Sequence, residues 1–256
     1  MKSYSRLILG NLSEVFNGKT PSKAEQRTNG YPVLKIKDVN ELGLFHGSFE
    51  SFVDMELGQK YSIKSVMKGD TLILNAAHNA NYVGSKIYYP EPATFGSLAT
   101  GEWLIIRPNT LKLDSKYLNH WVRSPEARYA IRDIVKGIHL YPKDVARLQI
   151  PLPPLAEQKR IAAILDAADA LRTKRRESLA QLDILVQSKF LEMFGDPVTN
   201  PKRWNVVNGE TVCERITVGV VIKPASYYRE TGIPALRSLN VKVGKIELND
   251  LVYISK

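Results

Sequence analysis

The pattern of hydrophobic and polar residues divides the chain at its longest uninterrupted stretch, residues 155–194. This stretch contains no proline or glycine and is rich in Ala, Leu, Arg, Gln and Glu, which are strong helix formers. Pro151, Pro153 and Pro154 precede it, and Gly195 and Pro197 follow it. Because proline is tolerated only in the first turn of a helix, we predict one helix over residues 155–193, about 58 Å long.

Apolar residues recur at spacings of three and four along this predicted helix. Such a heptad stripe is typical of a helix that pairs with another helix, and we expect the stretch to act as a spacer rod. Charged residues, among them Arg172 and Arg175, interrupt the stripe at its centre. The alternative is an ordinary amphipathic helix that packs on a globular core. The predicted helix-pairing residues are Ile161, Leu165, Ala168, Leu179, Leu182, Val186 and Met193.

Residues 1–153 alternate between short strand-like and helix-like patterns, which predicts an α/β (α+β) fold. Helices are expected at residues 117–122 and 126–136, the second with Ser124 and Pro125 at its start. Strands are expected between glycine and proline turns, at residues 31–39, 71–74, 85–89, 102–107 and 146–151.

An internal repeat links the two sides of the rod at an offset of about 202 residues. The matching residues are Gly30, Pro32, Leu34 and Lys35 with Gly232, Pro234, Leu236 and Arg237, then 38–40 with 240–242, and, after a slip of one residue, Gly43 and Phe45 with Gly244 and Ile246. We therefore expect a globular domain at 1–153, the spacer helix at 154–195 and a second, repeated domain at 196–256. That second copy is too short to close its own core, so we expect a truncated or degenerate form.

Charge and cysteine content narrow the class of partner and the compartment. The net charge is +10, from 36 basic and 26 acidic residues, and the excess lies outside the rod. A basic surface favours a polyanion partner, nucleic acid first, although many basic proteins have no such partner. Cys213 is the only cysteine, there is no apolar run long enough to span a membrane, and the N-terminus lacks a signal-peptide core. We expect a cytoplasmic protein without membrane contact.

Catalytic motifs are absent from the sequence, which favours a non-enzyme. We find no methylase N-P-P-[YF] or D-P-P-[YF] motif, no dinucleotide fingerprint and no phosphate loop. The four histidines have no metal-ligand spacing with Cys213 or with each other, so no metal site is predicted. A weak nuclease-like pattern joins Asp144 to Glu157 and Lys159, but an acid in the first turn of a helix is explained by the helix dipole.

Three segments of residues 1–153 carry residue types that suit DNA contacts. Residues 18–21 form a turn with a cation and a hydroxyl, which suits phosphate. Residues 76–86 combine asparagines with cations that can reach base edges, and residues 135–144 place cations and aromatics just before the rod. Lys35 and Lys37 are expected on one face of a strand. The predicted DNA-binding residues are Lys19, Thr20, Lys35, Lys37, His78, Asn79, Asn81, Tyr82, Lys86, Lys136, His139, Tyr141 and Lys143.

The segment IPLPPLAEQKRIAAILD (150–166), the long helix that it opens and FGDP (194–197) resemble the specificity subunits of type I restriction–modification enzymes. Weaker signals in the expected order are LGNLSEVFNGKTP (9–21), YPVLKIKDV (31–39) with its echo GIPALRSLNV (232–241), and KGDTLI (68–73). The resemblance covers the whole chain. It is most specific in residues 153–166.

The resemblance implies two target-recognition domains, each reading half of a bipartite DNA site, separated by helices that pair as a ruler. It implies docking to methyltransferase subunits, joined by nuclease–translocase subunits. S-adenosylmethionine, ATP and Mg would serve those partners, and this chain would bind no cofactor and catalyse nothing. The incomplete second domain departs from the pattern, and we expect a homodimer through the long helix instead. The rival interpretation is a coiled-coil adaptor for proteins whose basic charge is incidental, and an autonomous methyltransferase lacks its motif.

Overall fold

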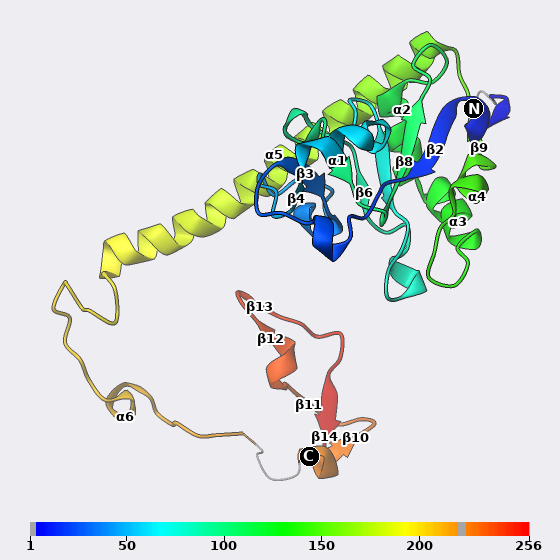
Figure 1. The fold of residues 1–256 in the computed structure, drawn as a ribbon. Helices are drawn as coiled ribbons and strands as arrows, with labels where there is room; N and C mark the ends of the chain where they lie inside the picture. Colours follow the sequence, from blue (N-terminus) through cyan, green and yellow to red (C-terminus); the bar gives the residue numbers. More distant parts are fainter. Residues whose placement is uncertain (1–3, 220–223, 256) are drawn as a thin grey trace. The chain divides into compact units, whose positions relative to one another are not determined.

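The computed structural model describes residues 4–219 and 224–255 (Figure 1). The chain divides into two compact units, one up to residue 181 and one from residue 182 onward. The long helix α5 (Leu155–Phe194) contains the boundary between them.

A four-stranded antiparallel sheet forms the centre of the first unit, with the strand order β2-β8-β5-β6. Its strands are β2 (Ser13–Asn17), β8 (Trp103–Pro108), β5 (Thr71–Leu74) and β6 (Ile87–Tyr88). β8 pairs with both β2 and β5, so Ile106 lies opposite Val15 on one side and Thr71 on the other. Mixed helices and strands around this sheet confirm the predicted fold class.

Both faces of this sheet are buried. Successive side chains of a strand point to opposite faces, and each set packs into its own core. Ile73, Leu104 and Ile106 pack into one core together with residues of the helices and the start of α5. Leu72, Trp103 and Ile105 pack into a second core on the other face. This explains why β8 is a nearly continuous apolar run with no half-polar alternation.

Two smaller sheets flank the central one. β3 (Tyr31–Leu34) pairs antiparallel with β4 (Phe52–Val53) and parallel with β7 (Leu98–Ala99). β1 (Arg6–Ile8) pairs antiparallel with β9 (Gln149–Pro151), which ties the start of the described chain to the segment that leads into α5.

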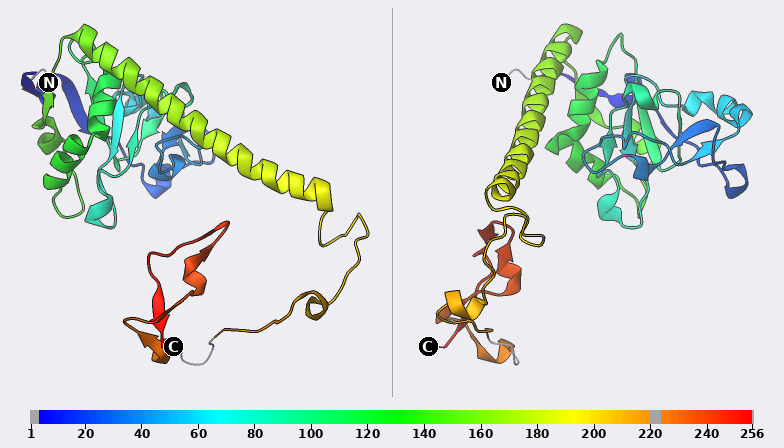
Figure 2. Two further views of the ribbon diagram at one scale, coloured as in Figure 1. Left: turned by 180° about the vertical axis from the view of Figure 1, so that it is seen from behind. Right: turned by 90° about the vertical axis from the view of Figure 1, so that its left-hand side faces the viewer.

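The helices of the first unit are α1 (Met55–Lys60), α2 (Ser115–Arg123), α3 (Pro125–Asp133), α4 (Pro142–Ala146) and the first part of α5. The side chain of Asp114 caps α2, and that of Ser124 caps α3, whose first residue is proline as predicted. Figures 1 and 2 show α5 running along the same side of the unit as α2. The predicted helix over 155–193 is confirmed and ends one residue later, at Phe194.

Gln158 fixes the start of α5 to the globular unit. Its side chain is 1% exposed. Its Oε1 accepts a hydrogen bond from the backbone N of Asp114 at 2.8 Å, and its Nε2 donates to the carbonyls of Pro153 at 2.9 Å and Lys112 at 3.1 Å. One turn further, Ala162 is buried in the core and Ile161 packs against it. The first two turns of α5 therefore belong to the core.

Several predicted elements are wrong at their boundaries. The strand expected at 31–39 ends at Leu34, because a 3₁₀ turn (Ile36–Asp38) follows, closed by a 2.7 Å hydrogen bond from the backbone N of Lys35 to the Asp38 carboxylate. The strand expected at 85–89 shrinks to β6, and the one expected at 146–151 shrinks to β9 because α4 precedes it. The helix expected at 126–136 ends at Asp133. β1, β2, β4, β7, α1 and α4 were not predicted.

The repeat recognised in the sequence has a structural counterpart in the second unit. There β11 (Ile233–Ala235) pairs antiparallel with β14 (Val252–Ile254), as β3 pairs with β4, and the first pairs in register are Ile233↔Ile254 and Tyr31↔Val53. A 3₁₀ turn (Ser238–Asn240) follows β11, closed by a 2.9 Å bond from the backbone N of Arg237 to Asn240 Oδ1. It repeats the turn that Lys35 and Asp38 close.

Further features of the two copies agree. Gly43 and Gly244 have φ values of +75° and +72°, in the left-handed region that favours glycine. The bridge between Val39 and Phe45 corresponds to the pairing of β12 (Val241–Lys242) with β13 (Lys245–Ile246). The contact of Arg27 with Phe52 corresponds to β10 (Tyr228–Arg229) on β14. The segments 27–53 and 229–254 are therefore two copies of one structural motif.

The second unit is otherwise open. Besides this motif it contains the end of α5 and the short helix α6 (Gly209–Val212). In residues 182–219 and 224–255, no hydrophobic side chain is buried, whereas the first unit has three buried clusters. Within the described residues, this second copy lacks the strands against which the first copy of the motif packs.

Candidate nucleic-acid interface

Two of the three predicted DNA-contacting segments lie next to each other in the first unit. Leu140 donates its backbone N–H to the carbonyl of Asn75 at 2.7 Å, and Ala76 forms a β-bridge with His139. The loop at residues 76–82 follows β5, and the loop at residues 135–144 follows α3. These contacts make them a pair of adjoining loops. The sequence predicted each loop but gave no sign that they adjoin.

The third segment, the turn at residues 18–20, joins this pair through residues 99–101. The backbone N of Lys19 donates to the carbonyl of Ala99 at 2.8 Å, and Thr20 Oγ1 accepts a hydrogen bond from the N–H of Gly101 at 2.9 Å. Gly101 also accepts a 2.8 Å bond from Nδ2 of Asn75. Gly18 is required here, because a Cβ at this position would lie 2.2 Å from the carbonyl oxygen of Thr100. The structure therefore brings all three segments into one neighbourhood.

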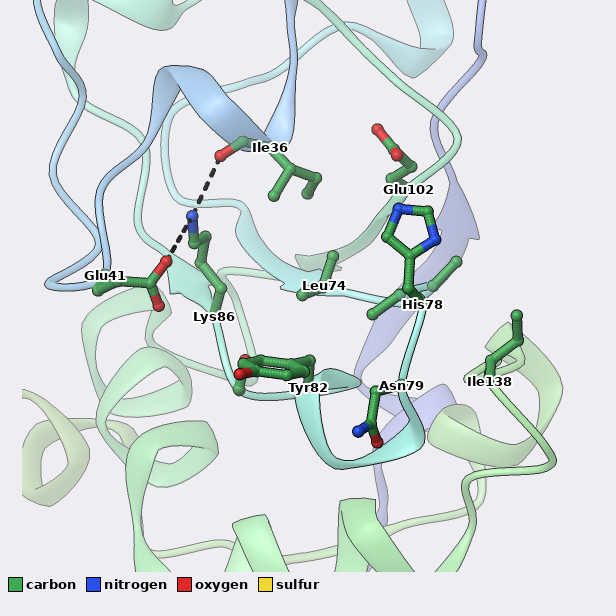
Figure 3. A pocket seen from close by; sticks show the side chains of 12 residues that line it. Ile36, Glu41, Leu74, His78, Asn79, Tyr82, Lys86, Glu102 and Ile138 are labelled. Carbon is green, nitrogen blue, oxygen red and sulfur yellow. Dashed lines mark hydrogen bonds and ion pairs between the residues drawn. The ribbon is translucent and has the colours of Figure 1, made fainter.

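Two hollows open on this neighbourhood. The first has a volume of about 530 Å³ and is lined by His78, Asn79, Tyr82, Glu102 and Ile138 among others (Figure 3). The second, about 860 Å³, lies between β2 and α4 and is lined by residues that include Asn17, Lys136, Tyr141, Lys143 and Arg147. These concave, mixed polar and apolar surfaces are suited to base edges and to the sugar–phosphate backbone.

The side chains of the first loop are mostly available. His78, Asn79, Asn81 and Tyr82 are exposed, Tyr82 to 62%. Asn79 caps a 3₁₀ turn (Ala80–Tyr82), and its Oδ1 accepts a 2.9 Å bond from the backbone N of Asn81. One lone pair of that oxygen is thus committed to the turn, which leaves Asn81 as the freer amide for a two-bond contact with adenine.

Lys86 was wrongly included among the predicted DNA-binding residues. Its residue is only 8% exposed. The Nζ donates to the carbonyl of Val39 at 2.8 Å and to that of Ile36 at 3.3 Å, and it lies 3.1 Å from the carboxylate of Glu41 (Figure 3). A buried ammonium that is satisfied in this way holds the 36–41 segment on β6 and is not available to DNA.

The placement predicted for Lys35 and Lys37 is also wrong. The two residues do not share a strand face, because Lys35 precedes the 3₁₀ turn and Lys37 lies within it. Lys37 forms an ion pair with Glu50, and Lys35 is half-buried. Burial raises the pKa of Asp38 in this turn, although the backbone hydrogen bond from Lys35 opposes the effect. The turn has a structural role in both copies of the motif.

The cations of the second loop are partly engaged. Lys136 donates to the Asp144 carboxylate at 2.6 Å and lies 6.0 Å from the ring centre of Tyr141. The rings of His139 and Tyr141 are 6.2 Å apart, and both residues are exposed. Lys143 is exposed at the surface of the second hollow. Lys143 is therefore the cation of this loop best placed for a phosphate.

Lys64 and Glu102 were not singled out from the sequence. Nζ of Lys64 donates to the carbonyl of Asn17 at 2.6 Å, beside the 18–20 turn. Burial lowers the pKa of Lys64, and the charge of Lys19 adds to this effect. Lys19 itself lies 5.3 Å from the ring centre of Tyr61. Lys64 and Glu102 were missed because their roles depend on contacts with residues far away in the sequence, which no local pattern signals.

The long helix carries a separate candidate surface. Ile161 packs against the core of the first unit, so its assignment to a helix-pairing seam is wrong and the alternative of packing on a globular core holds for this end of α5. Farther along, large apolar residues are exposed. Those of the predicted seam are Leu165 (40%), Leu179 (54%), Leu182 (55%), Val186 (70%) and Met193 (60%), and Ala168 is also exposed.

The charged centre of α5 faces the first unit in part. Arg172, 3.7 Å from Asp169, lines a hollow of about 800 Å³ together with Arg176, Arg123 and Arg128. Burial lowers the pKa of Arg123 in spite of the nearby charge of Asp169. Nearer the start of α5, Asp166 accepts hydrogen bonds from Lys116 at 2.6 Å and from Nε2 of His120 at 2.8 Å. These contacts hold α5 against α2.

Other chemistry has little support in the described part of the chain. Among residues 4–219 and 224–255, no group of three or more His, Cys, Asp or Glu side chains is placed to hold a metal ion. The nuclease-like pattern is accounted for by ion pairs of Asp144 with Lys136 and of Glu157 with Arg160. Cys213 is exposed. None of the described helices has a stretch apolar enough to cross a bilayer.

Comparisons with known proteins agree on one group. The family model for the type I restriction modification DNA specificity domain matches residues 3–182. The putative type I restriction enzyme MjaX specificity subunit of Methanocaldococcus jannaschii is 24% identical over 97% of this chain and 62% of its own length. The EcoKI specificity subunit of Escherichia coli is 26% identical over 87% of this chain and 50% of its own length.

The same group appears among solved structures. A structure from work on complex assembly and conformational transition in a type I R-M system superimposes with a TM-score of 0.55 and 21% identity, covering 91% of this chain and 60% of that one. This likeness shows a shared fold. The chain spans between half and two thirds of the length of these relatives. Since the family model covers well over half of the chain, the protein belongs to the family of type I restriction–modification DNA specificity domains.

Proposed function

We propose that this chain is a non-catalytic specificity subunit that selects the DNA target of a type I restriction–modification complex. The adjoining segments 18–20, 76–82 and 135–144 read one half of a bipartite site, and the rod docks methyltransferase subunits. Nuclease–translocase subunits join that assembly, and the partners use S-adenosylmethionine, ATP and Mg. A DNA target also fits the expected cytoplasmic location.

One observation carries the proposal most strongly. Segments chosen from the sequence for their DNA-contacting residue types are linked by hydrogen bonds and a β-bridge within the unit that the family model matches. Three independent segments would not be expected to adjoin if each were an ordinary turn. Lys19, Lys136 and Lys143 supply cations for phosphate, and His78, Asn79, Asn81 and Tyr82 supply groups for base edges.

The bipartite character of the site is supported by the repeated motif. The segments 27–53 and 229–254 have matching strand pairs, turns and left-handed glycines. Two copies of a recognition domain separated by a rod would read two half-sites at a fixed distance. At about 58 Å the rod exceeds one duplex turn of about 34–36 Å, so half-sites a turn apart are within its reach.

The partner of the rod is a second helix that covers its exposed apolar residues. Contiguous apolar surface of this kind is usually covered in the working assembly. The proposed domain division is 1–153, 154–195 and 196–256. The helix that covers the rod is supplied by a second copy of the chain or by a methyltransferase subunit.

The proposal is tested by methylome sequencing of a host with and without the gene, followed by duplex binding of the assembled complex. We expect one bipartite motif to be methylated only when the gene is present, and affinity for that motif to fall steeply with salt. No methylation change together with salt-independent binding would instead support a protein-binding adaptor.

Lys143→Ala refines this test. Loss of one phosphate contact should weaken binding to all duplexes by a similar factor and reduce the slope of log K against log salt by about 0.9. The matched control is Lys159→Ala, which removes the same charge from an exposed position on α5 outside the proposed interface. If both variants bind alike, the second loop does not contact DNA.

A further inference from the structure

The hollow beside residues 76–82 is lined by both apolar and polar side chains (Figure 3). Leu74, Ile36 and the ring of Tyr82 are among the groups that line it. Glu102 and His78 also line it. With a volume of about 530 Å³, the hollow has room for the edge of a planar base.

Two carboxylates line this hollow, and they differ in their partners. Glu41 lies 3.1 Å from the ammonium of Lys86, so its charge is balanced. Glu102 is exposed and has no ion pair with any residue in 4–219 or 224–255. Its carboxylate accepts a long hydrogen bond, 3.4 Å, from Oγ1 of Thr100.

The position of Glu102 is fixed by the same contacts that join the three segments. Its carbonyl oxygen accepts a 2.8 Å hydrogen bond from the backbone N of Asn75. The preceding residue, Gly101, contacts both Thr20 and Asn75. Glu102 directly precedes β8, whose first four residues, 103–106, are all buried. The carboxylate therefore extends from a rigid base at the centre of the proposed interface.

An unbalanced carboxylate at this place repels phosphate and lowers affinity for every duplex, unless it meets a hydrogen-bond donor. In the major groove the donors on base edges are the N6 amino group of adenine and the N4 amino group of cytosine. Guanine and thymine present acceptors there, which a carboxylate would repel. The cost of the charge is offset only at a site that places such an amino group in the hollow.

We propose that the carboxylate of Glu102 accepts a hydrogen bond from the exocyclic amino group of one adenine or cytosine and thereby determines the base pair at that position. This inference rests on the proposed function. Ile36 and Tyr82 line the same hollow, as do Lys86 and Glu41, which form an ion pair with each other.

The test is an amine-deletion scan on the methylated motif, with the chain assembled with its methyltransferase subunits. At each adenine the amino group is removed by using nebularine, and at each cytosine by using 2-pyrimidinone. For the native complex, one substitution inside the motif should reduce affinity by roughly tenfold or more. For Glu102→Ala that penalty should disappear, while the penalties at the other positions stay. The analogue that shows the effect identifies the base.

Two further variants separate base reading from charge and folding. Glu56→Gln removes the same charge from an exposed position on α1, outside the hollow. Glu56→Gln should raise the affinity for random duplex as Glu102→Gln does. It should leave the affinity penalty of every amino-group deletion unchanged. Glu102→Gln keeps an acceptor oxygen and should retain part of the selected penalty, which rules out misfolding as the cause.

The inference is overturned if Glu102→Ala keeps every penalty while the native complex still binds its motif specifically. In that case the proposed function stands without this contact. If the native complex shows no preference for any motif, both the proposed function and this inference fail.

Discussion

Single residues decide whether the rod and the globular unit act as one body. Gln158 is the clearest case, because three backbone groups from two loops share its amide. A buried polar group left without its partner costs about 1–3 kcal/mol. The segment that carries the family resemblance thus contains a residue whose role is to join the helix to the fold.

Gln158→Ala should lower the free energy of unfolding of the first unit by about 1–3 kcal/mol, because Asp114 N, Lys112 O and Pro153 O lose their partner. Denaturant titration followed by circular dichroism measures it. Gln181→Ala, at an exposed position of the same helix, should change stability by less than about 0.5 kcal/mol. Equal effects of the two changes would contradict the proposed role.

The sequence identified exposed side chains of the interface better than buried ones. His78, Asn81, Tyr82 and Lys143 are exposed, as reading DNA would require. Lys86 was misassigned because the carbonyls that hold its ammonium lie 47 and 50 residues away in the chain. A local pattern gives a cation but not its partners, and contacts between distant segments decide whether it reaches solvent.

At the scale of elements, local signals placed the long helix almost to the residue, and they failed where a turn interrupts a strand. Prolines mark the start of α5 because they are tolerated in a helix only in its first turn, and Gly195 ends the helix with a left-handed φ of +79°. In residues 31–39 the alternation of side chains continues through a 3₁₀ turn. The acid at 38, three residues after Lys35, was the available signal for that turn.

The contact of α2 with α5 should depend on pH through Asp166. Burial alone would raise the pKa of this carboxyl, but hydrogen bonds from Lys116 and His120 outweigh it and hold the pKa below its ordinary value. Its stabilising contribution is thus complete above the unfolded value of about 4 and is lost as pH falls through the lower folded value. Because the site is partly exposed, the effect should be modest.

We expect the stability difference between the native chain and Asp166→Asn to be constant from pH 8 to about pH 5 and to shrink below about pH 4. Denaturation midpoints across this range measure it. Asp183→Asn, at an exposed position farther along α5, should show no such convergence. A difference that grows on acidification would contradict the sign of the shift.

The exposed apolar residues of α5 are predicted to bind a helix. Leu182→Asp should abolish assembly with methyltransferase subunits or with a second copy, because it places a charge in an apolar contact. Co-purification and sedimentation measure assembly. Gln187→Asp, on the outer face of the heptad pattern, should assemble normally. If Leu182→Asp also assembles normally, the seam is assigned to the wrong residues.

At the scale of the whole molecule, the two units differ in how much structure supports them. The first has buried clusters on both faces of its sheet, whereas the described second unit has no buried hydrophobic side chain. Sequence alone identified the repeat, but the agreement of strand register and turns between the copies needed coordinates.

Limited proteolysis should therefore cut first between residues 196 and 219, where the described chain has little regular structure apart from α6. A fragment that contains the first unit and α5 should persist, as seen by mass spectrometry. Early cleavage inside residues 31–150 would contradict this division. A methyltransferase subunit bound to α5 should not slow the first cut.

The attachment of α5 to the first unit also limits how precisely the direction of the helix is set. From Asp166 to Phe194 the helix extends about 42 Å at ~1.5 Å per residue. Over that arm, a tilt of about 5° at the attachment moves the far end by about 4 Å, more than the rise of one base pair. The few bonds at Gln158 and Asp166 therefore limit the angular precision of anything the helix carries. Weakening them would make the distance between the two half-sites less precise without altering any contact to DNA.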